Sequence, residues 1–303
     1  MSSKETKLKY ECTISPIFYM GNKKKLIQKG LINFFPKKIH TFVDLFSGSA
    51  IVSMNVNASQ YIINDLEHNL IRLYCMFKNN LDDKIISHVE DRIDKYGLAR
   101  ERSKRNEFKD KVKLETYKQA YRNFRSDYNS SDIKNTLDFY TLMFYSFSQQ
   151  FRFNNKGDFN MPCGNDCFSD KNKEYIRNGC NFFSKNNVYI CNKDFGELKP
   201  DKLKKNDFVY LDPPYMNTTA TYNENGGWSE KDELRLHNLC EQLNKQQIKF
   251  ALSNVFLNKG IENKQLIDWV KENKFNVHYF NNFNYMACGK GNAKTVEVLI
   301  TNY

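Results

Sequence analysis

Residues 208–215 constrain the fold of this chain more than any other stretch, because an apolar run ends there in an acid, two prolines and an aromatic ring. The run 208–211 has the composition of a buried β-strand. A central strand cannot continue through Pro213 and Pro214, because proline has no amide hydrogen and a fixed φ angle. Asp212 is therefore predicted to lie where a buried strand ends, which in open α/β sheets is the edge that binds ligands.

The groups in this stretch suit an exocyclic amine on a nucleobase. Such an amine is a poor nucleophile, because its lone pair is delocalised into the ring. The Asp212 carboxylate and a nearby backbone carbonyl would each accept an N–H bond and favour a usable lone pair, while the Tyr215 ring holds the base by stacking. The structural alternative is a capping Asp before a Pro-Pro turn, and these residues alone do not decide between the two.

Charge and composition point to a polyanionic partner. The chain has 303 residues, a formal net charge of +11 and a pI near 9.1. This balance favours nucleic acid over a membrane, with plain solubility as the alternative. The eight cysteines are scattered without zinc spacing, so we expect reduced thiols and no metal. We read no signal peptide and no membrane span, and we expect a cytoplasmic protein.

Two predicted strands near the N-terminus indicate a nucleoside site. Residues 41–46 form an apolar strand run around Asp44 and lead into a Ser-Gly-Ser-Ala turn. Small residues let the backbone approach a ligand there, and we expect a helix with free N–H groups to follow. The next strand ends in Asp65, which follows Gly48 by 17 residues, near the spacing at which a carboxylate takes ribose hydroxyls. An ordinary βα turn is the alternative.

The middle of the chain combines helical periodicity with a predicted hairpin. Between residues 98 and 125, ten basic residues stand against four acidic ones, which marks either a phosphate-contacting face or a solvated lysine-rich helix. The two halves of residues 148–162 alternate around an Asn-Lys-Gly turn, which predicts a β-hairpin. The amides, hydroxyls, aromatic rings and Arg152 of this segment are groups that read base edges and stack on bases.

The C-terminal part alternates strands with helices, which indicates βαβ units. The expected strands are 188–191, 208–211, 248–252, 275–280 and 294–300. Residues 218–228, which include Tyr222, are predicted to close over the substrate. Ser229 and Asp232 form the capping-box pattern of a helix that begins after this loop.

Taken in this order, the motifs resemble those of the Dam-type DNA adenine methyltransferases of the D12 class, alpha group, and more closely the T-even phage and Gram-positive members. The motifs are Gly21-Asn22-Lys23, Asp44-x-Phe46-x-Gly48, Asn64-Asp65, Arg152-x-Asn154-x-x-Gly157-x-Phe159-Asn160-x-Pro162, Asp212-Pro213-Pro214-Tyr215 and Leu252-Ser253-Asn254. The resemblance implies an α/β fold, with a Rossmann-like methyltransferase sheet of seven strands, the last antiparallel. It also implies an inserted, mostly helical target-recognition domain that carries the hairpin. Residues 1–66 and 186–303 would form the catalytic domain, and residues 67–185 the recognition domain.

The family moves a methyl group from S-adenosylmethionine to adenine N6 in duplex DNA after base flipping, commonly within GATC. The resemblance therefore implies this activity at GATC or a related short site, with double-stranded DNA as the partner and no membrane. A monomer and a dimer on DNA are both compatible with it. Whether the enzyme is solitary, phage-encoded or part of a restriction–modification pair is left open.

The resemblance and the patterns above assign roles to single residues. The expected cofactor-binding residues are Tyr19, Lys23, Asp44, Phe46, Gly48, Asp65, Asp194, Phe195 and Asp212. The expected catalytic residues, which also hold the target base, are Asp212, Pro213, Pro214 and Tyr215. The expected DNA-binding residues are Phe147, which would enter the duplex, and Ser148, Gln150, Arg152, Asn154 and Pro162. The chain departs from the enteric enzyme at Phe18, where that enzyme has a base-reading Lys.

Three other functions compete with this one. Methylation of cytosine N4 uses the same amine chemistry, but Ser in place of Asp212 would favour it. RNA is a possible substrate, although the hairpin resembles a reader of duplexes. A non-catalytic DNA-binding decoy is the third, and methyl incorporation from a labelled cofactor separates it from an enzyme.

Overall fold

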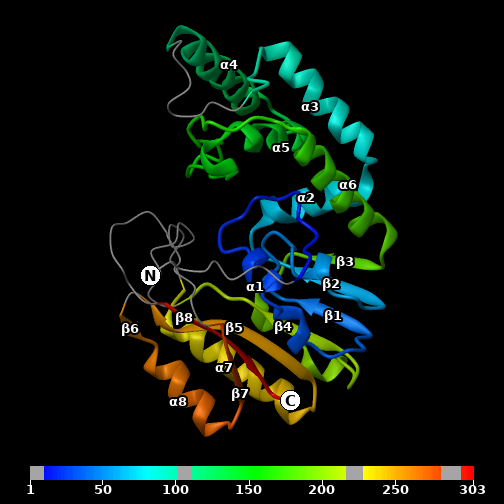
Figure 1. Ribbon diagram of the computed structural model, residues 1–303, viewed down its shortest axis with the longest axis vertical. Coiled ribbons are helices and arrows are strands. Elements are labelled where there is room, and N and C mark those ends of the chain that lie inside the picture. The colour runs from blue at the N-terminus through cyan, green and yellow to red at the C-terminus, as the bar shows by residue number, and fades with distance from the viewer. Residues whose placement is uncertain (1–9, 102–110, 216–227, 259, 281–294) are drawn as a thin grey trace, which may run out of the picture. The chain divides into compact units, whose positions relative to one another are not determined.

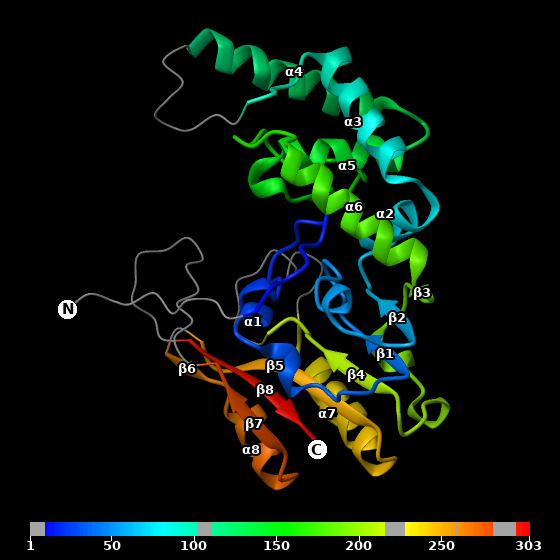
Figure 2. The same ribbon diagram turned by 45° about the vertical axis from the view of Figure 1, so that its right-hand side comes forward.

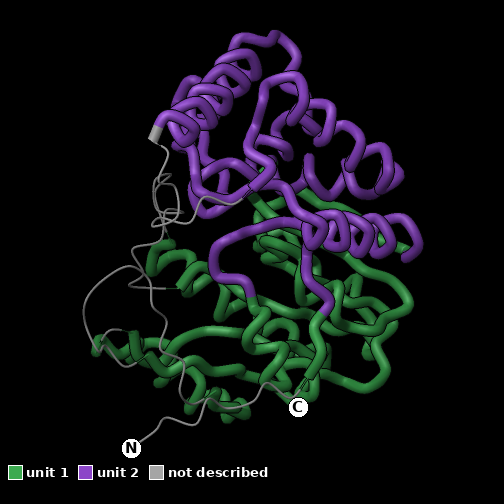
Figure 3. Tube along the Cα trace, turned by 45° about the horizontal axis from the view of Figure 1, so that its top comes forward, with its two compact units in different colours: residues 1–12, 23–68, 187–303 green, residues 13–22, 69–186 purple. Residues whose placement is uncertain are grey.

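A computed structural model describes the chain except residues 1–9, 102–110, 216–227, 259 and 281–294. It divides into two compact units (Figure 3). Unit 1 comprises Met1–Cys12, Lys23–His68 and Asn187–Tyr303, and unit 2 comprises Thr13–Asn22 and Asn69–Asn186. The divisions after residues 68 and 186 lie close to those expected after residues 66 and 185. The segment Thr13–Asn22 differs from expectation, because it belongs to unit 2.

Unit 1 is built on one mixed sheet with the strand order β3-β2-β1-β4-β5-β8-β7 (Figure 1). Strands β1 to β5 pair in parallel, and the last strand, β8, runs antiparallel between β5 and β7. The expected seven-strand sheet is confirmed. The short strand β6, which pairs with β5, was not predicted. The strands are β1 (Thr41–Asp44), β2 (Gln60–Asn64), β3 (Val188–Cys191), β4 (Phe208–Leu211), β5 (Lys249–Asn258), β6 (Ile261–Glu262), β7 (Asn276–Tyr279) and β8 (Val296–Thr301).

Successive side chains of a strand point to opposite faces of the sheet, so the buried strands contribute to an apolar core on each face. Alternate residues such as Val209 and Leu211 pack against apolar residues of α7 (Glu230–Lys245) and α8 (Lys264–Glu272), which lie on one face (Figure 2). On the other face, Phe35 contacts the rings of Phe208 and Tyr210 at centroid distances of 4.9 and 5.4 Å. Because both faces of β4 are buried, all four of its residues are apolar or aromatic.

The helical segments near the N-terminus are short, and the α-helix expected after β1 is absent. Helix α1 (Lys24–Gln28) stops before Gly30, whose φ of 95° is left-handed, and the 3-10 helix η1 (Leu31–Phe34) follows. No α-helix follows the turn after β1, and the 3-10 helix η2 (Ser53–Asn55) takes its place. The β-branched residues Ile51 and Val52 are buried just before η2 and have low helix propensity, which disfavours a longer helix. The predicted capping box at Ser229 is confirmed.

Unit 2 is mostly helical, as expected. Its helices are α2 (His68–Asn79, whose first residue belongs to unit 1), α3 (Asp82–Tyr96), α4 (Lys111–Ser130), α5 (Thr136–Tyr145) and α6 (Asp170–Lys185). Aromatic rings fill its core: Phe77 contacts Tyr140 edge-on at 5.3 Å and stacks on Phe183 at 6.2 Å. None of the helices in the described parts of the chain is long and apolar enough to cross a membrane.

The segment Thr13–Asn22 belongs to unit 2 because its Pro16 is held there from two sides. The Tyr140 hydroxyl donates to the Pro16 carbonyl at 3.0 Å. Helix α6 presents Gly179 to the proline ring, and a Cβ added at Gly179 would lie 2.5 Å from Pro16 Cγ. A larger residue at position 179 would therefore collide with a stiff ring.

Residues 148–162 reverse direction at Gly157 as predicted, with a φ of 81°. The two arms are joined by one bridge, between Phe153 and Phe159, and form no extended strands. A two-stranded hairpin is marginal by itself. Its rings instead pack on Phe139 of α5, at 5.4 Å for Phe153 and 6.0 Å for Phe159.

Parts of two predicted features lie outside the described residues. These are most of the loop 218–228, including Tyr222, and residues 102–110 of the basic stretch.

We predict that Gly179→Ala lowers the free energy of unfolding. Overpacking against Pro16 costs about 1–3 kcal/mol, which exceeds the gain of about 0.5–1 kcal/mol that alanine brings inside a helix. Urea denaturation followed by circular dichroism measures the change. The control is Glu174→Ala, an exposed position of the same helix, which should change stability by less than about 0.5 kcal/mol. A more stable Gly179→Ala variant would contradict the prediction.

Candidate active site

The end of β4 brings a carboxylate, a cation and an aromatic ring together. Lys23 Nζ lies 2.6 Å from Asp212 Oδ2, with exposed fractions of 6% and 17% for the two side chains. The Tyr215 hydroxyl donates to Asp212 Oδ1 at 3.2 Å. Lys23 Nζ also lies 5.3 Å from the centroid of the Tyr215 ring. Burial raises the pKa of Asp212 while Lys23 lowers it, so the lysine stabilises the anion.

Asp44, at the end of β1, is a buried acid with one unused oxygen. Its Oδ2 accepts a hydrogen bond from Ser53 Oγ at 2.6 Å. Its Oδ1 is buried and has no hydrogen-bond partner among the described residues. Burial raises the pKa of Asp44 to about 7, and the charges of Asp212 and Asp65 act in the same direction. A buried acceptor without a donor is rare in proteins, so Oδ1 marks where a ligand donor fits.

Asp65, just after β2, is tied to the turn after β1. Its Oδ2 accepts from the Gly48 amide at 2.8 Å, and its Oδ1 accepts from the Glu67 amide at 3.0 Å. Burial raises the pKa of Asp65 to about 6, and these two backbone donors lower it. The turn is tight, because Gly48 and Ala50 have φ values of 53° and 57°. Each carboxylate oxygen keeps a second lone pair for a ligand hydroxyl.

Three aromatic rings cluster beyond the ends of β1 and β3. Phe46 lies 5.4 Å from Phe195 and 5.9 Å from Trp228, and Phe195 lies 5.4 Å from Trp228. Phe46 and Trp228 are only partly buried. Glu233, in the first turn of α7, fixes the indole by accepting a hydrogen bond from Trp228 Nε1 at 2.6 Å. A planar heterocycle would find apolar faces here. The sequence did not single out Trp228.

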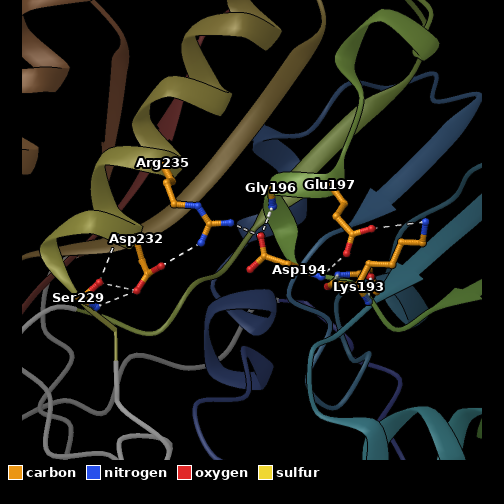
Figure 4. Close-up of polar contacts among 8 residues, drawn as sticks. Lys193, Asp194, Gly196, Glu197, Ser229, Asp232 and Arg235 are labelled. Atoms are coloured by element: carbon orange, nitrogen blue, oxygen red, sulfur yellow. Dashed lines mark hydrogen bonds and ion pairs between the residues drawn. The ribbon is translucent and has the colours of Figure 1, made fainter.

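Asp194 is held by an arginine that the sequence also did not single out (Figure 4). Asp194 Oδ1 accepts from the Gly196 amide at 2.8 Å and pairs with Arg235 of α7. Arg235 is fixed by Asp232 at 3.0 Å, and its guanidinium carbon lies 4.6 Å from the centroid of the Phe195 ring. The Asp-x-x-Arg spacing at the start of α7 is the signal that sequence reasoning had available.

In unit 2, Phe147 is exposed and lies at the start of a strained turn. Its side chain is 52% exposed, and Ser148 and Gln149 after it both have left-handed backbone angles, with φ values of 57° and 55°. The Phe147 amide donates to the Pro162 carbonyl at 2.9 Å. Gly164 packs so closely that an added Cβ would lie 2.4 Å from the Ser146 carbonyl oxygen. Such strain persists only where surrounding contacts fix it, and it is concentrated at functional sites.

The other expected DNA-binding residues lie in the same part of unit 2. Arg152 Nε donates to Asn160 Oδ1 at 2.8 Å, which orients the guanidinium. Asn154 Oδ1 accepts from the amides of Lys156 and Asp158, each at 2.9 Å, so this oxygen builds the turn. Gln150 accepts at its backbone carbonyl from Ser146.

The structure brings most of the expected cofactor and catalytic residues together in unit 1. These are Lys23, Asp44, Phe46, Gly48, Asp65, Asp194, Phe195, Asp212, Pro213, Pro214 and Tyr215. Tyr19 is the exception, because it belongs to unit 2 and its ring stacks on Phe151 at 5.8 Å.

Comparison with known proteins gives one family. Residues 19–286 match the model of the D12 class N6 adenine-specific DNA methyltransferases. The modification methylase StsI of Streptococcus sanguinis is 37% identical over 299 residues, and the type II methyltransferase M.FokI of Planomicrobium okeanokoites is 37% identical over 296 residues. Each of these alignments covers 95% of this chain and 43% of the relative, so the chain spans less than half the length of either relative.

The DNA adenine methylase of Haemophilus influenzae is 25% identical over 230 residues, which are 73% of this chain and 72% of that protein. Identity is thus higher to the two type II enzymes than to this adenine methylase. The expected closer likeness to Dam-type enzymes of T-even phages and Gram-positive bacteria is not supported.

We predict that Asp44→Asn stabilises the protein at pH 8. The pKa of Asp44 is raised from 3.8 to about 7, so between these values the folded state holds a proton that the unfolded state has lost. Stability therefore falls as pH rises from about 4 to about 7, by about 4 kcal/mol as an upper limit. Asparagine cannot ionise, so its advantage should be absent near pH 4 and full above pH 7.

Urea denaturation of both proteins from pH 4 to pH 8 measures this difference. Asp201→Asn, at a side chain that is 62% exposed, is the control and should follow the original protein. Parallel pH curves for the Asp44→Asn variant and the original protein would contradict the prediction.

Proposed function

The chain belongs to the D12 class of N6 adenine-specific DNA methyltransferases, and from this membership we propose that it transfers a methyl group from S-adenosylmethionine to adenine N6 in double-stranded DNA. The observation that carries the proposal is Asp212 after β4, held by Lys23 at 2.6 Å and by Tyr215 at 3.2 Å. These contacts fix an anionic acceptor beside an aromatic ring at the edge of the sheet where ligands bind.

The residues of unit 1 fit S-adenosylmethionine. This cofactor supplies a methyl group on a sulfonium, and it also carries an ammonium, a carboxylate, ribose hydroxyls and an adenine. The ammonium suits the unpaired Oδ1 of Asp44. The ribose hydroxyls suit Asp65, whose oxygens keep lone pairs beside the Gly48 turn. The adenine suits the partly buried rings of Phe46 and Trp228 with Phe195.

Charge supports the same fit. The charges of Asp65 and Asp212 both raise the pKa of Asp44. Among the described residues, the only cation that forms an ion pair with any of these three acids is Lys23, which pairs with Asp212. A ligand with sulfonium and ammonium charges offsets this excess of negative charge. We keep Tyr19 and Asp194 as further cofactor-binding residues of this proposal.

In the proposed reaction, Asp212 orients the amine of the target adenine. Rotation of the adenine out of the duplex costs a few kcal/mol, and the Tyr215 ring then holds the base by stacking. Asp212 and the Pro214 carbonyl accept the two N6–H bonds, while Pro213 and Pro214 keep the loop rigid. The N6 lone pair forms the new N–C bond as the C–S bond breaks, with its electron pair left on sulfur. One N6 proton then leaves, with Asp212 as the base toward which its hydrogen bond points.

Recognition of DNA is assigned to unit 2. Phe147 is exposed and rigidly presented, which suits a ring that enters the base stack. Arg152, oriented by Asn160, suits bidentate contact with a guanine. Ser148, Gln150, Asn154 and Pro162 complete the proposed reading surface. We propose a short site, and GATC is the first sequence to test.

We predict that Asp212→Asn lowers methyl transfer by at least roughly 100-fold, because the amide no longer accepts through both oxygens and loses the anionic charge. Incorporation of labelled methyl groups into plasmid DNA measures the rate. Binding to a DNA duplex, followed by fluorescence anisotropy, should change little. The control is Asp201→Asn, a surface carboxylate, which should leave both unchanged. Transfer at the original rate by Asp212→Asn would remove this residue from the mechanism.

We predict that Arg152→Ala relaxes one position of the recognised site, since a bidentate contact contributes about 1–3 kcal/mol of discrimination. Lys156→Ala, at the exposed tip of the same segment, should weaken binding evenly over all sequences. Methylation-sensitive long-read sequencing of DNA from cells that express each variant gives the modified base and its context. An even loss of methylation with Arg152→Ala would make this arginine a phosphate contact.

A further inference from the structure

Arg235 of α7 contacts the two residues that lead into the proposed adenine site after β3. Its Nη2 pairs with Oδ1 of Asp194, which lies 41 residues earlier in the chain (Figure 4). Its guanidinium carbon lies 4.6 Å from the ring centroid of Phe195, one of the aromatic residues proposed to hold the cofactor adenine. The proposed transfer of the methyl group does not by itself give this arginine a role.

The first turn of α7 fixes Arg235. Asp232 Oδ1 accepts a hydrogen bond from Arg235 Nη1 at 3.0 Å, and Asp232 Oδ2 accepts from Ser229 Oγ at 2.6 Å in the capping box. Two carboxylates thus bind the two ends of one planar guanidinium, which a lysine ammonium does not reproduce because it is a point charge. The Arg235 and Asp194 side chains are 39% and 35% exposed, so their ion pair adds little to stability. What the pair fixes is the orientation of the Asp194 carboxylate.

Asp194 keeps acceptor capacity for a ligand. Its Oδ1 accepts from the Gly196 amide at 2.8 Å as well as from Arg235, and the side chain caps the 3-10 helix η4 (Phe195–Glu197). The two oxygens of a carboxylate offer about four positions for hydrogen bonds. Because the Gly196 amide and Arg235 both bind Oδ1 and the side chain is partly exposed, lone pairs of Oδ2 stay available to a ligand that donates.

The glycine at position 196 leaves just enough room for this contact. A Cβ added at Gly196 would lie 2.7 Å from Arg235 Nη2 and 2.9 Å from Asp194 Oδ1. Glycine permits such a close approach because it has no side chain. An alanine there would displace the guanidinium, which is the end of a long, flexible side chain, before it displaced the backbone. Gly196→Ala therefore separates Arg235 from Asp194 without removing either charge.

Position 6 of a purine offers Asp194 a group to select. Adenine carries an amine there, which donates, whereas hypoxanthine carries an oxygen, which accepts. A carboxylate paired with an arginine accepts hydrogen bonds and does not donate, so it favours the amine over the oxygen. A site built to hydrogen-bond one group of a ligand strongly rejects an analogue that lacks this group.

We propose that Arg235 is a positioning residue for the cofactor of the methyl transfer proposed above, on which this inference rests: it holds Asp194 Oδ1 so that Oδ2 accepts from the 6-amino group of the cofactor adenine. Arg235 thereby makes the site select adenine over a 6-oxo purine. It keeps the Phe195 ring in the same arrangement through its contact with the ring face. Because this role concerns the adenine and not the reacting methyl group, its effect falls on binding.

The binding test compares S-adenosylhomocysteine with S-inosylhomocysteine, the same compound with an oxygen in place of the 6-amino group. Isothermal titration calorimetry on the full chain gives the ratio of the two dissociation constants. The original protein should bind the adenosine compound roughly 10- to 100-fold more tightly. In Arg235→Ala and in Gly196→Ala the ratio should fall to within a few fold, because Asp194 is no longer held. Similar affinity of the original protein for both compounds would overturn the proposal.

Lys231→Ala is the control, since it removes a positive charge from an exposed position of the same helix. This variant should keep the original ratio. If Arg235 only joined α7 to the residues after β3, its loss would weaken the binding of both compounds equally. An unchanged ratio in Arg235→Ala would therefore overturn the proposal.

Asp194→Asn tests whether Arg235 acts through Asp194. The asparagine amide donates as well as accepts, so this variant should bind both compounds with similar affinity. Arg235→Ala should cause no further change of the ratio in the Asp194→Asn background, because the acceptor that Arg235 positions is already lost. A further change in the double variant would contradict a role through Asp194.

Methyl transfer separates failure of this inference from failure of the proposed function. Arg235→Ala should raise the KM for S-adenosylmethionine roughly 10-fold or more and keep kcat within a few fold. Methylation of DNA by an original protein that does not discriminate between the two compounds overturns this inference alone. Discrimination without methylation of any DNA supports the role of Arg235 and overturns the proposed methyl transfer.

Discussion

The ion pair between Lys23 and Asp212 is the interaction on which the catalytic edge of unit 1 depends. Removal of a charged partner from a buried pair leaves the other charge uncompensated, which is strongly unfavourable. Asp44 and Asp65 lie at the same edge, and burial raises their pKa values to about 7 and about 6, so ionisation of either acid costs free energy in the folded chain. One lysine does not neutralise three carboxylates. Unit 1 therefore gives up stability to keep acceptors ready for a ligand, and a cationic cofactor that binds only the folded chain restores it.

The topology of the sheet explains how distant residues reach one edge. The parallel strands β1, β2 and β4 end beside Asp44, Asp65 and Asp212, so each contributes an acid from the same end. An antiparallel strand contributes from its beginning, and β8 does so with Glu297. A sheet of this kind therefore gathers acids from the ends of its parallel strands and the start of its antiparallel one. Burial of the strands on both faces keeps these groups at fixed separations.

Local chemistry made part of this site predictable from the sequence. The bounds of β4 agree with the apolar run before Asp212, because two prolines leave a strand no other place to end. Gly48 and Asp65 follow neighbouring strands as expected, and the Gly48 amide donates to Asp65 Oδ2 at 2.8 Å, while the expected binding of ribose hydroxyls by Asp65 stays a prediction. The helix expected after β1 was wrong, because a small-residue turn signals a helix start only when the next residues favour a helix. The extended strands of the hairpin were wrong because aromatic packing on Phe139 replaced strand pairing.

Other parts of the site depend on pairings between residues far apart in the chain. Arg235 pairs with Asp194, which lies 41 residues earlier, and the Asp-x-x-Arg spacing at the start of α7 predicts only the contact of Arg235 with Asp232. Sequence patterns therefore located the acids at strand ends and also named Lys23 and Tyr215, whereas the contact of Arg235 with Asp194 and that of Trp228 with Glu233 emerged only from the packing.

The division of the chain adds a constraint on Lys23. Unit 2 includes Thr13–Asn22, and Lys23 is the next residue, in unit 1. Unit 2 holds this segment through Pro16, which accepts from Tyr140 and packs on Gly179. The residue paired with Asp212 is therefore joined by one peptide bond to a segment that unit 2 holds. A substitution that changes how Pro16 packs acts on the backbone shortly before Lys23, so the proposed roles of the two units share one short stretch of chain.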